Sequence, residues 1–247
     1  MTVHPATNGT RRLWPSLVAV TVLLVVAAAL LSLACWQWGR AAEKEHLLAR
    51  QAARGQQQPL DWAQLRALGA DVADRPVRLS GSFRPDLHVA LDNQMRNGVA
   101  GFHLYVVFQP EGSPDGVLVN VGWVPTDRDG GPAVPSAMPG AHDITGWAVY
   151  PSAFLTVGEP EFTRGLWRAG RIEPAVWAQR WGVSLVPWVV RLAPEVPGGY
   201  VRDWQAGAEM RMSPGRHRAY AFQWAALAVA WCVCWFYAWR KLGREIV

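Results

Sequence analysis

Residues 17–36 read LVAVTVLLVVAAALLSLACW, an apolar run of 20 residues with no charged side chain. At a rise of about 1.5 Å per residue, a helix of this length covers the ~30 Å hydrocarbon core of a bilayer. A second uncharged run, AYAFQWAALAVAWCVCWFYAW, occupies residues 219–239. Backbone groups in hydrocarbon must bond within their own segment, so both runs are predicted to be transmembrane helices. The fold is therefore decided by one span near each end of the chain.

The distribution of charge predicts how these spans are oriented. Basic residues are enriched in short loops on the cytoplasmic side of a membrane. Five of the 24 Lys and Arg residues lie in the two tails, against one of the 19 Asp and Glu residues. The predicted parts are a cytoplasmic N-terminal tail (1–16), transmembrane helix 1 (17–38), an extracytoplasmic domain (39–218), transmembrane helix 2 (219–239) and a cytoplasmic C-terminal tail (240–247).

The first apolar run has a rival interpretation as a cleaved signal peptide, because Arg11 and Arg12 precede it and it ends in LSLAC at Cys35. It is longer than the core of a signal peptide, which has about 7–15 residues. Ser32 and Leu33 also match a lipoprotein cleavage site poorly. We therefore predict that this helix is retained and that the chain crosses the lipid bilayer twice.

The segment between the spans is nearly neutral, so the pI of about 9.5 is a property of the tails. This distribution favours membrane topology over nucleic-acid binding, and no nucleic-acid partner is predicted. The three cysteines, Cys35, Cys232 and Cys234, all lie in the spans. The domain is therefore predicted to have no disulfide and to depend on its own apolar core.

Two short helices are predicted in the domain. Asp61, with Gln64 three residues later, has the pattern of a capping box for a helix that ends near Gly69. Pro174 is suited to the first position of a second helix, which ends near Gly182.

The rest of the domain shows short β-type runs separated by turn residues. The first run includes Val77, Leu79 and Phe83, with a bulge predicted at Gly81. The sequence PDG at 114–116 predicts a hairpin. We predict six or seven strands in a compact antiparallel β-rich barrel or sandwich, with runs at 76–83, 88–92, 101–110, 117–125, 142–151 and 186–192.

Catalytic motifs are missing from the sequence. It contains no G-x-S-x-G, H-E-x-x-H, G-x-x-x-x-G-K or C-x-x-C, and no enzymatic activity is predicted. Cys232 and Cys234 lie about 200° apart around a helix, which does not favour a shared metal. His88, His103 and His142 fall in or beside predicted strands and are interpreted as surface or packing side chains.

His217 stands at the start of the second span. His217, Tyr220 and Trp224 are spaced i, i+3 and i+7, which places an imidazole, a phenol and an indole on one side of a helix. A neutral imidazole is a good axial ligand for haem iron, and aromatic neighbours pack against a flat porphyrin. On this geometry two roles remain open, a haem ligand and a residue that merely anchors the helix at the interface.

Five motifs between and beside the spans carry a family resemblance. They are CWQWGRAAEKEHLL (35–48), VRLSGSF (77–83), NGVAGFHLYVVF (97–108), VLVNVGWVP (117–125) and HRAYAFQW (217–224). In this order the chain resembles the surfeit locus protein 1 family, the SURF1-like membrane proteins that assist cytochrome c oxidase assembly. The matching positions include Trp36, Gln37, Arg40, Lys44, Gly98, Gly101, Asn120, Gly122, Trp123, His217, Tyr220 and Trp224.

The sequence departs from the family pattern at a few places. Val121 replaces the usual Arg before Gly122 and Trp123, and Gly215 and Arg216 stand where Asn is common. Ala225 replaces a usual aromatic residue. These departures indicate a divergent bacterial member, located in the inner (plasma) membrane, and leave its client oxidase open.

The resemblance implies a chaperone-like role in respiratory chain complex IV assembly. It implies that the protein receives haem a from haem a synthase and holds it for insertion into the large subunit of cytochrome c oxidase. The iron ligand carried over is His217, with Tyr220 and Trp224 beside it as candidate haem-binding residues. Roles in the fold are expected for Gly101, Gly122 and Trp123.

Three other interpretations are compatible with parts of the sequence. In the first, the protein is a membrane scaffold that stabilises an oxidase assembly intermediate without binding haem. In the second, it has the same role for a quinol oxidase. A membrane-tethered enzyme or copper donor is disfavoured, because copper transfer uses soft thiolate or thioether ligands and the domain has no cysteine.

Overall fold

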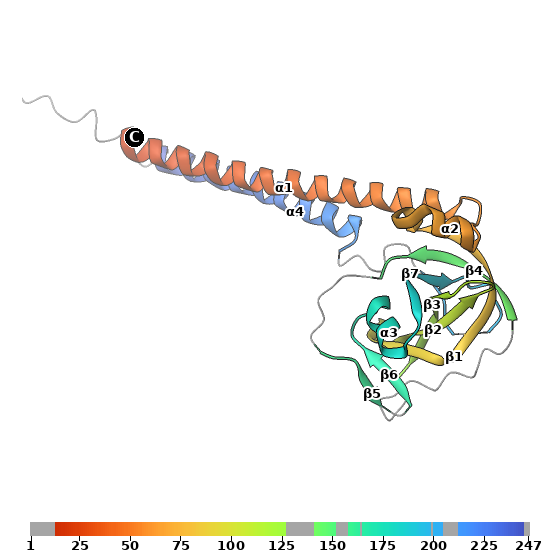
Figure 1. Ribbon diagram of the computed structural model, residues 1–247. Helices are drawn as coiled ribbons and strands as arrows, with labels where there is room; N and C mark the ends of the chain where they lie inside the picture. The colour runs from red at the N-terminus through yellow and green to blue at the C-terminus, as the bar shows by residue number, and fades with distance from the viewer. Residues whose placement is uncertain are drawn as a thin grey trace, which may run out of the picture. The chain divides into compact units, whose positions relative to one another are not determined.

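The computed structural model describes residues 13–126, 141–151, 158–163, 165–198, 200–204 and 212–244. The chain divides into two compact units, Met1–Ala49 with Met210–Val247, and Arg50–Glu209. The first contains one long helix and most of the other, and the second contains the β-sheet (Figure 1).

The long helices are α1 (Leu13–Gly55) and α4 (Pro214–Arg244). Both contain stretches that are long and apolar enough to cross a membrane, with mean hydropathy 2.8 in Leu17–Gly55 and 1.5 in Pro214–Lys241. Helix α1 continues well beyond the apolar run, through the Ala-, Glu- and Arg-rich segment after residue 38.

The two helices run antiparallel in the helix unit, because Leu23 contacts Trp231 while Gln37 contacts His217. The less exposed residues of each helix recur at alternating spacings of three and four, the heptad pattern of packed helix pairs. On α1 this stripe includes Leu23, Leu30, Ala34, Gln37 and Ala41, and on α4 it includes His217, Ala221, Trp224, Ala228, Trp231 and Trp235. His217 therefore lies within a packed seam.

The β unit contains seven strands among the described residues, in agreement with the predicted six or seven. They are β1 (Arg75–Arg96), β2 (Val99–Pro110), β3 (Asp115–Pro125), β4 (Ala141–Val149), β5 (Glu161–Thr163), β6 (Leu166–Ala169) and β7 (Ser184–Leu192). The sheet order is β2-β3-β7-β4-β1-β6-β5, and β2 also pairs with β1. Five strands therefore close into a barrel, with β6 and β5 attached to the second half of β1.

The prediction of a purely antiparallel sheet is wrong, because the sheet is mixed. Strand β7 runs parallel to β3, and β6 runs parallel to β1. The helix α3 (Pro174–Trp181) precedes β7 and is part of the connection that brings β7 between β3 and β4. Parallel pairing needs a long crossover of this kind, which local sequence patterns do not reveal.

The barrel interior and its outer face hold separate apolar clusters. Phe102, Leu104, Val106 and Phe108 alternate along β2 and belong to the interior cluster. Tyr105 and Val107, which point the other way, pack in a second cluster with Trp177 of α3. This two-sided burial explains why β2 and β3 read as nearly continuous apolar runs.

The two short helices are confirmed. Asp61 and Gln64 form the predicted capping box at the start of α2 (Trp62–Leu68), which ends at Gly69. Helix α3 begins at Pro174 and ends at Gly182, whose φ of 65° is left-handed.

The predicted bulge at Gly81 is wrong. Val77, Leu79 and Phe83 alternate without interruption, and the register of β1 instead shifts between Arg84 and His88 and between Leu91 and Gln94. Gly81 serves a close approach, since a Cβ there would lie 2.2 Å from the backbone oxygen of Gln109.

A return segment (residues 193–198 and 200–204) crosses β3 on its way from β7. The backbone N–H of Trp123 donates to Val201 O at 2.8 Å, and that of Tyr200 donates to Val121 O at 2.9 Å. Gly122 has φ of 125°, and a Cβ on it would lie 2.7 Å from the carbonyl carbon of Tyr200. Trp123 is buried over Gly101. The expected roles of Gly101, Gly122 and Trp123 in the fold are thus confirmed.

Candidate functional site

The site with the clearest chemistry lies in the seam of the helix unit. His217 is 7% exposed, and its Nδ1 lies 2.6 Å from Oε1 of Gln37 on α1. The two residues are 180 positions apart in the sequence. Gln37 is half-buried, so this hydrogen bond is largely shielded from solvent. Burying polar side chains in an otherwise apolar seam costs free energy unless they are hydrogen-bonded, and this bond offsets part of that cost.

The second ring nitrogen of His217, Nε2, is buried and has no hydrogen-bond partner within the described ranges. Leaving a buried polar atom unsatisfied costs about 1–3 kcal/mol. Nε2 is also the nitrogen that binds metals in many proteins when Nδ1 is held by another group. Nε2 is therefore the unpaired nitrogen of the ring, and it is shielded from solvent in this conformation.

Charged groups surround the solvent-side end of the seam. Lys44 Nζ donates to Met212 O at 2.6 Å, and Arg218 pairs with Glu45 at 2.7 Å. The guanidinium of Arg218 also lies 5.9 Å from the ring centre of Trp38, a cation–π distance. Of the polar residues of the first motif, Gln37 therefore reaches α4 itself and Lys44 reaches Met212, just before α4 begins.

Tyr220 and Trp224 are placed differently by the structure. Trp224 lies half-buried in the same stripe as His217, while Tyr220 is 44% exposed. Trp36 and Trp38 are also exposed. The structure thus brings His217 and Trp224 into the seam and directs Tyr220 outward.

Gln37 is the functional candidate that the sequence did not single out. It matches a family motif, but nothing in the α1 sequence alone indicates that it meets His217. The available signal was the heptad spacing from Leu23 through Leu30 to Gln37, which places the amide on the packed face of α1.

A second polar group lies on the outer face of the barrel, around His103 of β2. His103 and Tyr105 hydrogen-bond to the side chain of Asn120, whose Oδ1 accepts from Gly122 N at 3.1 Å. The indole of Trp204 stacks on His103 with ring centres 5.6 Å apart. Burial lowers the pKa of His103 to about 4 and raises the pKa of Tyr105. His103 is therefore neutral at physiological pH.

His103 is a weaker ligand candidate than His217. Its Nδ1 is also buried without a partner, but one face of its ring is covered by Trp204 of the return segment. His88 has a comparable Nε2, and its Nδ1 contacts Pro85 O at 2.6 Å. Across the part of the chain that the structure describes, no group of three His, Cys, Asp or Glu side chains is arranged to hold a metal ion.

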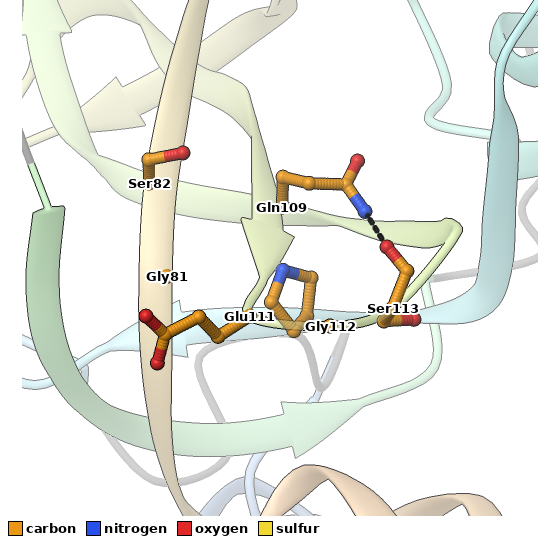
Figure 2. A pocket seen from close by; sticks show the side chains of 7 residues that line it. Gly81, Ser82, Gln109, Glu111, Gly112 and Ser113 are labelled. Carbon is orange, nitrogen blue, oxygen red and sulfur yellow. Dashed lines mark hydrogen bonds between the residues drawn. The ribbon is translucent and has the colours of Figure 1, made fainter.

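A shallow depression of about 460 Å³ lies at the β2–β3 turn of the barrel unit (Figure 2). It is lined by Gly81, Ser82, Gln109, Pro110, Glu111, Gly112 and Ser113. Gln109 Nε2 donates to Ser113 O at 2.5 Å and holds the turn closed. These residues include no imidazole, thiol or aromatic ring, so the depression is not suited to a haem.

The fold and site define a class: a two-helix protein with a small closed barrel, whose candidate ligand lies between the helices. The model of the SURF1 family matches residues 24–229, which covers most of both units. The chain therefore belongs to the SURF1 family, a family of assembly factors associated with cytochrome oxidase assembly. No curated protein matches the sequence.

Proposed function

We propose that this protein is a membrane-anchored assembly factor that binds haem a through His217 during its insertion into the large subunit of cytochrome c oxidase. Haem a synthase is the proposed donor. The observation that carries the proposal is the buried, partnerless Nε2 of His217 in a helix long and apolar enough to cross a membrane. Family membership supports the link to oxidase assembly.

The donor chemistry fits a haem that is carried rather than kept. A single neutral imidazole ligates haem iron reversibly, as a carrier requires. Because Nε2 is shielded in the closed seam, haem binds only when the ring turns outward or the helices separate. Trp224 is close enough in the stripe to pack against a flat macrocycle, and Tyr220 covers its outer edge.

The carboxylates of a haem find partners at the same end of the helices. Arg40, Lys44 and Arg216 lie on α1 and α4 within a turn or two of Gln37 or His217. Arginine and lysine are suited to carboxylate binding, and Arg40 already holds Glu43 at 2.5 Å. In the proposed orientation these cations lie at the extracytoplasmic surface, where a haem's polar edge meets water.

The proposed topology places both termini in the cytoplasm of a bacterial cell and the barrel outside it. The basic residues Arg11, Arg12, Arg240, Lys241 and Arg244 support this orientation. Haem a is then taken up, held and released at the outer surface of the membrane.

The proposal is tested by purifying the full-length protein from cells that co-express a haem a synthase and recording its absorption spectrum. We expect the wild type to carry haem a and His217→Ala to lose most of it. His46→Ala is the matched control, because His46 is an exposed histidine of α1. If His217→Ala kept the full haem content and spectrum, the ligand assignment would be wrong.

A scaffold without haem is the second candidate, and one observation favours it. Met95 and Val99 flank the tip of the β1–β2 hairpin and are 65% and 50% exposed, which suits contact with a partner protein. A scaffold would copurify with oxidase subunits yet be colourless when haem a is present in the cell. Copurification with quinol oxidase subunits would instead identify that enzyme as the client.

A further inference from the structure

The hydrogen bond between Gln37 and His217 specifies which ring nitrogen carries the proton. The atom of Gln37 that faces the ring is Oε1, which accepts hydrogen bonds and cannot donate them. In this arrangement of the Gln37 amide, Nδ1 of His217 is the donor of the hydrogen bond, at 2.6 Å. In a neutral imidazole the other nitrogen, Nε2, then has a lone pair and no proton.

This tautomer needs a cause, because an unconstrained imidazole in water prefers the proton on Nε2. Nε2 has no partner among the described residues, so nothing on that side selects the tautomer. The N–H of residue 217 is used in the backbone of α4, where it donates to Ser213 O. Among the described residues, Gln37 is therefore the one that hydrogen-bonds to the ring.

We infer that Gln37 is a positioning residue, which holds His217 in the tautomer whose Nε2 lone pair is ready to bind a metal centre. The inference rests on the proposed function for the identity of that centre as haem iron. Metal-binding histidines generally donate their other N–H to a second group, which orients the ring and increases its basicity. Here the second group comes from the opposite helix, so ligand readiness depends on the pairing of α1 with α4.

A purely structural role for the pair makes different predictions. A polar pair in a helix seam specifies register, and its loss weakens the pairing whichever nitrogen is protonated. A positioning role requires in addition that the tautomer changes when the acceptor is removed. The two roles are therefore separated by measuring protonation in the protein without haem.

The first test is nitrogen NMR of the full-length, haem-free protein, labelled with ¹⁵N-histidine and placed in lipid nanodiscs. His217→Ala identifies the resonances of His217 by their loss. In the wild type we expect a protonated Nδ1 and an unprotonated Nε2. In Gln37→Leu we expect the proton to move to Nε2, while Gln37→Glu, which keeps an acceptor, retains the wild-type pattern.

The second test measures haem a content after co-expression with a haem a synthase. We expect Gln37→Leu to bind about 10–100-fold more weakly, as for other residues that orient a metal ligand. Gln37→Glu should bind and should shift the reduction potential of the iron to a lower value, because a carboxylate makes the imidazole more basic. Gln223→Leu is the matched control, since Gln223 is an exposed glutamine of α4.

Failure of the inference is distinguishable from failure of the proposed function. A wild-type His217 protonated on Nε2, or a Gln37→Leu variant with an unchanged tautomer, would overturn the positioning role whether or not haem binds. A colourless wild type that shows the expected tautomer shift would reject haem binding and leave Gln37 as the group that sets the tautomer.

Discussion

Among the described residues, the barrel and the helix pair each contain one polar side chain that is almost completely buried, and the two differ in their hydrogen bonding. In the barrel, Asn120 is 3% exposed and bonds to Gly122, His103 and Tyr105. In the helix pair, His217 is 7% exposed, and one of its two ring nitrogens has no partner in the described segments. The first arrangement stabilises a fold, and the second leaves bonding capacity for a ligand. The difference makes the helix pair the stronger candidate for ligand binding.

The largest effect is expected where the return segment crosses the barrel. Gly122→Ala places a methyl group 2.7 Å from the Tyr200 backbone at a φ of 125°, so we expect a loss of about 3 kcal/mol or more in the free energy of unfolding. Urea denaturation followed by near-UV circular dichroism measures it.

Gly112→Ala is the control for this substitution, because Gly112 also has a positive φ, 69°, but a Cβ there meets nothing within 4 Å. We expect a loss of about 1 kcal/mol. Equal losses in the two variants would show that the return segment does not pack on Gly122 as described.

The next effect concerns pH and His103. Burial lowers its pKa from 6.5 to about 4 in the folded protein, so the unfolded chain binds more protons between these values. Stability is therefore complete above pH 6.5 and falls as the pH decreases toward 4, by up to about 3 kcal/mol. Urea denaturation across this range should lose most of that slope in His103→Phe, which keeps a ring against Trp204. A slope of undiminished size in the variant would contradict the assignment to His103.

Asn120 provides a test of moderate size. Asn120→Leu removes the acceptor for Gly122 N–H and leaves that donor buried, so we expect a loss of about 1–3 kcal/mol in barrel stability. Haem a content per folded protein should not change. Ser80→Ala, which removes an exposed hydrogen bond to Asp143, is the control and should change stability by less than about 0.5 kcal/mol. A selective loss of haem in Asn120→Leu would show that the barrel participates in binding.

The smallest effect is expected at the surface of the helix pair. Arg218 and Glu45 are 49% and 40% exposed and their ion pair is screened by solvent. Arg218→Gln should lower the thermal stability of the helix pair by less than about 1 kcal/mol in nanodiscs. A loss as large as that of Gly122→Ala would mean that this pair, and not the apolar seam, holds the helices together.

The sequence predicts elements that depend on local patterns. The apolar runs at 17–36 and 219–239, the capping box at Asp61 and the start of α3 at Pro174 each follow from a few neighbouring residues, and the structure contains all of these helices. The mixed sheet and the uninterrupted alternation through Gly81 did not follow. They depend on β7 entering beside β3 and on β1 lying close to Gln109, which are contacts between distant segments.

The same distinction between local patterns and contacts of distant segments applies to the candidate site. His217 was found from its position at the start of an apolar helix, while its partner Gln37 comes from the other end of the chain. The side-chain direction of Tyr220 depends on how α4 rotates against α1, which the i, i+3, i+7 spacing alone does not specify. Sequence reasoning thus singled out the candidate ligand and missed the side chain that hydrogen-bonds to it.

The central claim, that the helix pair and not the barrel binds the cargo, is tested most directly by comparing two histidine variants in one experiment. Full-length wild type, His217→Ala and His103→Phe are purified from cells that co-express a haem a synthase, and haem a per protein is measured from the absorption spectrum. We predict that His217→Ala loses most of its haem while His103→Phe keeps the wild-type amount. Full retention by His217→Ala, or a selective loss in folded His103→Phe, would contradict this account.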